Sequence, residues 1–295
     1  MQFGEFLLFY KVAFVTLFEG LYMPPNASYN FDDFEPLLVT LQNTLGVVVP
    51  DEQRNTLVER IIPLLSIYEL DSLTELAKNL EGSQSESMRS VVLDVVSQTQ
   101  LSWALSAEVK HLLNDYVFSQ LSENARVWII GCGKGQSAYA VVMEAAEYEH
   151  KNDTQKDLQF IATDVSAADI KYAESGTYDQ QQILGLSEDY KRLFTSPNGT
   201  TAELQVKEKI RQNIRFIECD LTADFQSLGQ MDLIICPEAL AYFSNEVKAG
   251  ILQQCSDLLK SGGIFLTGYN QIVMPATSTL ERVEHSAGIF YRQKS

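Results

Sequence analysis

The alternation of short apolar runs with helical segments in the second half of the chain most narrowly limits its fold. Five runs are typical of buried strands: Val127–Gly133, Leu158–Val165, Ile214–Leu221, Met231–Pro237 and Gly263–Tyr269. Helical spacing of apolar residues occurs between them, at Tyr139–Glu149, Ala167–Ser175 and Val247–Leu259. Strands that alternate with helices predict a parallel sheet of the α/β class. A last run, Gly288–Gln293, is expected to add an antiparallel strand.

A small antiparallel insertion is expected at about residues 195–217. Ser196–Thr201 is rich in turn-forming residues. Glu203–Val206 and Ile214–Phe216 are expected to flank a small hairpin inserted into the sheet domain.

Residues 31–112 have apolar side chains at helical spacing and no strand-like alternation. We therefore expect a small all-α domain here, followed by the sheet domain at residues 113–295. Asp51, Asp71 and Ser87 stand where helix caps are expected, because each precedes an apolar run of helical period.

Residues 1–30 are interpreted as an N-terminal extension. The apolar run Phe6–Met23 is interrupted by Lys11 and Glu19, and no basic cluster precedes it. A membrane span needs about 20 nearly uncharged residues, and a signal peptide needs a basic start. The favoured interpretations are a packed helix, or a stretch upstream of a natural start at Met23.

Charge and cysteine usage exclude several classes of protein. With 39 acidic and 22 basic side chains the formal net charge is −17, which argues against binding to nucleic acid or to an anionic membrane. The four cysteines contain no close pair, which argues against a disulfide framework or a zinc site and favours a cytoplasmic location. The three histidines lack metal-ligand spacing, so no metal is expected.

A glycine-rich turn and a distant aspartate predict a nucleoside cofactor. Gly131, Gly133 and Gly135 follow the first strand, and Asp164 ends the second. Glycines let the backbone approach a ligand, and an acidic residue at the next strand end can accept hydrogen bonds from ribose hydroxyls. The GxGxG spacing matches neither a dinucleotide fingerprint nor a P-loop, so S-adenosylmethionine (SAM) fits best. The alternative is that the glycines serve only a tight turn.

At this point the chain resembles the CheR-type methyltransferases, over roughly residues 31–295. Phe160–Phe194 and Met231–Gly268 follow the family pattern closely. The resemblance implies a Rossmann-like SAM-binding sheet behind an all-α domain, with a small antiparallel insertion. It also implies O-methylation of glutamate side chains, with a chemotaxis receptor or another signalling protein as partner.

The resemblance also assigns site residues. Asp164 and Tyr242 are kept, Tyr242 as the catalytic candidate or else as a core aromatic beside Phe243. Asp220 and Leu221 stand where the family has an Asn-Leu pair near the adenine. Ser137 stands where a family glutamate holds the cofactor's ammonium. Glu238, which replaces a family asparagine, can supply the lost carboxylate if it points into the site.

Two departures from the family pattern affect the substrate side. The family's two arginines correspond to Ala104 and Pro237. An arginine would orient a carboxylate substrate through two hydrogen bonds. We call the two family arginines the substrate clamp, and the resemblance implies that this clamp is degraded here. Residues 1–112 also carry a net charge of −9, which would repel glutamate-rich receptor helices. Three interpretations stay open: a divergent CheR-type methyltransferase, a weak or inactive relative acting as a SAM-binding or protein-interaction module, and a methyltransferase for another substrate.

Overall fold

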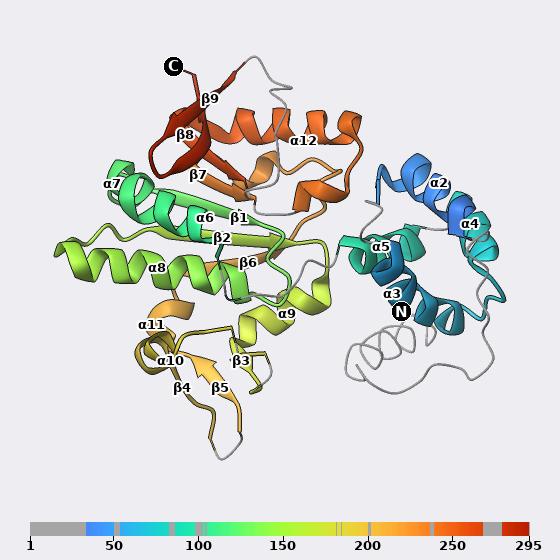
Figure 1. The fold of residues 1–295 in the computed structure, drawn as a ribbon, viewed down its shortest axis with the longest axis horizontal. Helices are drawn as coiled ribbons and strands as arrows, with labels where there is room; N and C mark the ends of the chain where they lie inside the picture. The colour runs from blue at the N-terminus through green and yellow to red at the C-terminus, as the bar shows by residue number, and fades with distance from the viewer. Residues whose placement is uncertain are drawn as a thin grey trace. The chain divides into compact units, whose positions relative to one another are not determined.

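The computed structural model describes residues 34–49, 54–82, 86–97, 103, 105–180, 182–183, 185–199, 202–236, 239–267 and 279–294. The chain divides into two compact units, coloured mainly blue and green to red in Figure 1. The first unit runs to Ser97 and includes Tyr242–Ser244, and the second holds the remaining residues. The second unit therefore includes the helix Ala107–Leu112, which the sequence-based boundary at residue 112 places in the helical domain. The expected N-terminal extension lies outside the described residues.

The described part of the first unit is helical. Its helices are α2 (Phe34–Leu45), α3 (Arg54–Ile67), α4 (Leu73–Glu81) and α5 (Glu86–Ser97). The predicted cap at Asp71 is wrong, because the hydroxyl of Ser72 accepts the N–H of Glu75 at the start of α4. The predicted cap at Ser87 is also wrong, because α5 already includes that residue. Asp51 lies outside the described residues.

Seven of the described strands in the second unit form one sheet in the order β6-β2-β1-β7-β8-β10-β9. The strands are β1 (Arg126–Ile130), β2 (Gln159–Asp164), β6 (Ile214–Glu218), β7 (Met231–Cys236), β8 (Leu259–Thr267), β9 (Leu280–His285) and β10 (Gly288–Gln293). Neighbours from β6 to β8 run parallel, and β10 is antiparallel to both β8 and β9. The predicted α/β class and the antiparallel last strand are confirmed.

Helices cover the sheet, and three of them cross it in Figure 1: α6 (Ala107–Leu112), α7 (Phe118–Gln120) and α8 (Gln136–Asn152). The remaining helices are η3 (Leu113–Val117), α9 (Ala167–Ser175), α10 (Glu188–Phe194), α11 (Glu208–Arg211), η4 (Gln226–Leu228), η5 (Ala239–Tyr242) and α12 (Asn245–Leu258). Val127 and Ile129 of β1 pack in one core cluster with α6 and α8. The alternate residue Trp128 is equally buried and contacts Phe225 instead. Both faces of β1 are therefore covered, which explains its unbroken apolar run.

The small antiparallel sheet has the order β3-β5-β4. Its strands are β3 (Thr177–Tyr178), β4 (Thr195–Pro197) and β5 (Leu204–Val206). The antiparallel insertion is confirmed, but the expected hairpin flanked by Glu203–Val206 and Ile214–Phe216 is wrong. β5 pairs with β3 and β4, whereas Ile214 begins β6 and pairs with Phe160 of β2 in the large sheet.

Candidate cofactor site

The glycine turn lies directly after β1. Gly131, Gly133 and Gly135 all have positive φ, at 71°, 49° and 95°, in the region that favours glycine. The N–H of Gly131 donates to the carbonyl of Thr163 at 2.8 Å, which keeps the turn beside the end of β2. A Cβ on Gly131 would lie 2.9 Å from the Cβ of Ala239, so the segment after β7 also packs closely here.

Asp164 is the link between this turn and the neighbouring strands. Its Oδ2 accepts the N–H of Gly133 at 2.7 Å, and its Oδ1 accepts the N–H of Ser166 at 3.1 Å. Its carbonyl accepts the N–H of Cys219 at 2.8 Å, beyond the end of β6. Burial raises the pKa of Asp164, and the backbone N–H donors partly offset this by stabilising the carboxylate. One residue, Asp164, therefore joins the ends of β1, β2 and β6, through its carboxylate to the turn after β1 and through its backbone carbonyl to the segment after β6.

Asp220, Leu221 and Ser137 are the other predicted site residues whose side chains the structure describes. Asp220 follows β6, and its Oδ1 accepts the N–H and the hydroxyl of Thr222 at 2.8 and 2.7 Å. Leu221 beside it is buried. Ser137 is the second residue of α8 and is half-buried. Asp220 thus follows the strand next to β2, at the carboxyl edge of the sheet, where parallel sheets bind ligands.

The side chains at four positions named in the sequence analysis lie outside the described residues. Glu238, Pro237 and Ala104 lie outside the described residues. Tyr242 ends η5 and belongs to the first compact unit, and its side chain lies outside the described residues. Their roles stay predictions.

A second buried carboxylate, Asp169, was not predicted from the sequence. It lies in the first turn of α9 and is 7% exposed. Burial and the charge of Asp164 raise its pKa to about 6, although the nearby ammonium of Lys134 lowers it. Lys134 lies between Gly133 and Gly135, so the Asp169 carboxylate interacts electrostatically with a charge on the glycine turn. Burial, and then the charges of the same two carboxylates, raise the pKa of the Cys132 thiol. A thiol that stays protonated is a poor nucleophile.

Gln136, the first residue of α8, is 1% exposed, and its Oε1 has no hydrogen-bond partner in the described structure. A buried polar atom without a partner costs free energy. Such an acceptor beside the glycine turn fits a donor group from a ligand.

These residues fit a nucleoside cofactor. Each carboxylate oxygen of Asp164 accepts one backbone N–H, and a carboxylate oxygen can accept a further hydrogen bond, here from a ribose hydroxyl. Two acidic groups near the turn, the half-buried Asp164 and the buried Asp169, are unsuited to a phosphate. The donor and acceptor set thus favours an uncharged ribose over a dinucleotide pyrophosphate.

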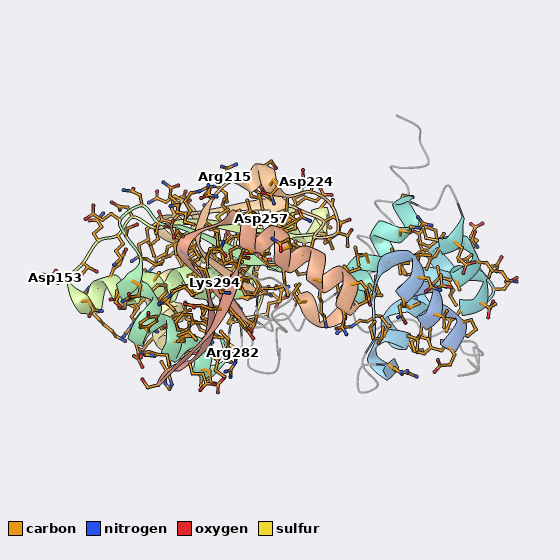
Figure 2. The ribbon with its side chains drawn as sticks, turned by 90° about the horizontal axis from the view of Figure 1, so that it is seen from above. Asp153, Arg215, Asp224, Asp257, Arg282 and Lys294 are labelled. Atoms are coloured by element: carbon orange, nitrogen blue, oxygen red, sulfur yellow. The ribbon has the colours of Figure 1, made fainter. Side chains whose placement is uncertain are left out.

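A hollow of about 630 Å³ lies at the opposite edge of the sheet. Its lining includes the first residues of β1 and β2, Arg126 and Gln159, together with Arg215 of β6 and His150 near the end of α8. Arg126 already donates to the carbonyls of Leu228 and Gln230. Arg215 is exposed and lies at the periphery of its unit in Figure 2. None of the predicted site residues lines this hollow.

The strand order and the carboxylate at the end of β2 define a Rossmann-like protein of the α/β class that binds a nucleoside cofactor. The family described as CheR methyltransferase, SAM binding domain, matches residues 102–289. The chain therefore belongs to the CheR methyltransferase family, and S-adenosyl-L-methionine is its cofactor, as the glycine turn and Asp164 predict.

Three relatives resemble the chain over most of its length. The chemotaxis protein methyltransferase Cher2 of Pseudomonas putida is 27% identical, over 89% of this chain and 98% of its own. Chemotaxis protein methyltransferase 1 of Pseudomonas aeruginosa is 28% identical over the same shares. Chemotaxis protein methyltransferase 1 of Vibrio cholerae is 26% identical, over 86% of this chain and 94% of its own. Among the residues that the structure describes, no helix is long and apolar enough to cross a membrane.

Proposed function

We propose that this chain transfers the methyl group of SAM to glutamate side chains of a chemotaxis receptor, or of a related signalling protein, in the cytoplasm. The observation that carries the proposal is the hydrogen bond from Gly133 to Asp164, which holds the glycine turn against the ribose-binding candidate. The family of the chain and the names of its relatives support the same activity.

The bound cofactor supplies a methyl group on a positively charged sulfur. A new O–CH₃ bond forms to the glutamate carboxylate while the S–CH₃ bond breaks, and its electron pair stays on sulfur. The carboxylate and the sulfonium thereby both become neutral, so no proton has to be removed from the nucleophile. The protein's task is to hold the two groups in line.

On the cofactor side, we assign the ribose to Asp164 and the adenine to Asp220 and Leu221. The glycine turn provides a close approach for the ligand, since Gly131, Gly133 and Gly135 lack Cβ atoms. We assign the cofactor's ammonium to the region of Ser137 and Glu238, and a position near the transferred methyl to Tyr242.

On the substrate side, we propose that the loss of arginine at positions 104 and 237 slows catalysis. Without a bidentate partner, the glutamate carboxylate loses both charge compensation and orientation. A displacement of about 1 Å can cost on the order of 10²-fold in rate. We further propose that the helical domain docks the substrate protein, and that the net charge of −9 on residues 1–112 confines docking to a receptor surface with compensating cations.

The test is transfer of labelled methyl from SAM to a receptor cytoplasmic fragment by the wild type and by Ala104→Arg. We expect slow transfer by the wild type and faster transfer by the variant, because the new guanidinium can pair with the glutamate carboxylate. Pro237→Arg is a less direct test, since removing the proline also frees the backbone after β7. Brisk transfer by the wild type would show that other residues supply the clamp.

The loss of both arginines also favours a second candidate, a SAM-binding or protein-interaction module without catalysis. Titration of S-adenosylhomocysteine (SAH), the demethylated product, separates the two candidates when it is read beside the transfer assay. Binding of SAH without any transfer, even by Ala104→Arg, would favour the module. Absence of SAH binding by the wild type at millimolar ligand would contradict the proposed cofactor site.

A further inference from the structure

A tyrosine hydroxyl from the small sheet donates a hydrogen bond to the glycine turn. Tyr178, the second residue of β3, is 1% exposed. Its hydroxyl donates to the carbonyl of Lys134 at 2.6 Å, although the two residues are 44 positions apart. Lys134 lies between Gly133 and Gly135, so this bond reaches the middle of the turn.

The ring of Tyr178 is held in place on several sides. Trp103 packs edge-on against it with 4.8 Å between ring centroids, and Tyr172 and Tyr139 lie at 5.9 and 6.4 Å. The indole of Trp103 also donates to the carbonyl of Gln182 at 2.7 Å. Because these neighbours leave the ring little freedom, its hydroxyl has a defined position.

The absence of a side chain at Gly135 leaves the space that this hydroxyl occupies. A Cβ on Gly135 would lie 2.9 Å from the hydroxyl of Tyr178 and 2.8 Å from the Cβ of Ala173. Glycine at position 135 is thus needed both for its φ of 95° and for the space that Tyr178 occupies. Burial raises the pKa of Tyr178 well above its ordinary value, so the group stays protonated and remains a donor at neutral pH.

Tyr178 is also part of the small sheet, where it pairs with Leu204 of β5. We infer that Tyr178 is a positioning residue for the cofactor, whose hydroxyl fixes the Lys134 carbonyl and thereby couples the small antiparallel sheet to the glycine turn. This inference rests on the proposed cofactor site. It goes beyond that site because it gives the insertion a role in cofactor affinity.

The test compares two substitutions that each remove one buried hydroxyl. Tyr178→Phe deletes the bond to the turn, and Tyr139→Phe deletes a matched 2.8 Å bond to the carbonyl of Ala173, outside the turn. Tyr139 is also 1% exposed, so both variants should lose similar thermal stability. By titration calorimetry, we expect SAH affinity to fall about threefold to tenfold in Tyr178→Phe only, the size expected of one hydrogen bond.

A second measurement is independent of these variants. Bound SAH should slow amide hydrogen exchange at residues 177–178 and 204–206 of the wild type more than at the hairpin of β9 and β10. In Tyr178→Phe this protection should be lost. Equal SAH affinity in the two phenylalanine variants, or no protection of the small sheet in a wild type that binds SAH, would overturn the inference alone. A wild type that does not bind SAH would overturn the proposed cofactor site as well.

Discussion

The two edges of the large sheet differ in what they hold. At the carboxyl edge, the turn after β1 contains three glycines of positive φ. The half-buried Asp164 and the buried Asp169 both have raised pKa values there. At the amino edge, half of the residues that line a hollow of about 630 Å³ are exposed, among them Arg215, Gln159 and His150. The comparison shows that the candidate cofactor site is distinguished by its acidic groups and constrained backbone, and not by the volume of a cavity. Buried charge and a constrained backbone are costly features that ordinary packing does not require.

The largest effect should come from a methyl group added to the turn. Gly135→Ala forces a φ of 95° on alanine and crowds Ala173 and Tyr178, so we expect a loss of about 2–5 kcal/mol in the free energy of unfolding. The matched change near the amino end of β8 is Gly262→Ala, where φ is 76° and the space is open. It should cost about 1–2 kcal/mol. Urea unfolding measures both, and equal losses would contradict the crowding argument.

Removing one carboxylate charge should weaken cofactor binding at the carboxyl edge of the sheet but not at the amino edge. Asp164→Asn removes a half-buried acceptor that is charged, and we expect SAH binding to weaken by about 1.5–3 kcal/mol. Asp157→Asn makes the same change in the lining of the hollow, where asparagine tolerates the φ of 48°. Calorimetry should find its SAH affinity unchanged. If the two variants bind SAH equally well, Asp164 is not the ribose ligand.

The buried carboxylate of Asp169 on α9 should make the free energy of unfolding depend on pH. The pKa of Asp169 rises from 3.8 to about 6 on folding, so the folded state holds the proton more tightly. Its contribution to stability is present below pH 4 and is lost as pH rises through 6. A pKa shift of about two units corresponds to a free energy of about 3 kcal/mol for ionising the buried carboxyl group. In Asp169→Asn the neutral amide avoids this cost but still has to be buried, which offsets part of the gain. We therefore expect a gain of about 2 kcal/mol.

This gain should appear between pH 4 and 7 and stay constant above pH 7. Thermal unfolding of both proteins across this range measures it. A gain that does not change with pH would mean that Asp169 is charged in the folded protein throughout, with the ammonium of Lys134 fully compensating its burial.

The smallest effect is expected at the amino edge. Arg215→Ala removes an exposed side chain from the lining of the hollow, so the free energy of unfolding should change by less than about 0.5 kcal/mol. SAH affinity should not change. A tenfold change in affinity would show that the two edges communicate, and would break the comparison.

Much of the large sheet could be predicted because its central parallel strands, β2, β1 and β7, are buried on both faces. Such strands are continuous apolar runs, as in Val127–Ile130. The sequence of β9, Leu280–His285, gives no strand signal. It has only two apolar residues, Leu280 and Val283, three positions apart, in a strand at the end of the sheet. β3 and β4 are two and three residues long, too short to show a period.

The candidate cofactor site could be recognised in the sequence only where a local pattern exists. The glycine turn and Asp164 form such a pattern, and the structure joins them by a hydrogen bond. Asp169 escaped notice because Ser166 and Asp169 have the spacing of a helix cap, and Ser166 does accept the N–H of Asp169. Only the fold reveals that this capping residue is also buried beside Asp164. Tyr178 has no local signal, since its bond to Lys134 spans 44 positions.

The place of β10 in the sheet has a consequence for synthesis on the ribosome. β10 lies between β8 and β9, although it is made after both. Until Gly288–Gln293 has left the ribosome, the hydrogen-bonding edge of β8 has no partner from β10, and β9 has nothing to pair with. The sheet that carries the candidate cofactor site is therefore completed only after Gly288–Gln293 has been synthesised. A nascent chain arrested before residue 288 would expose an open strand edge, which is a surface that chaperones and aggregating chains recognise.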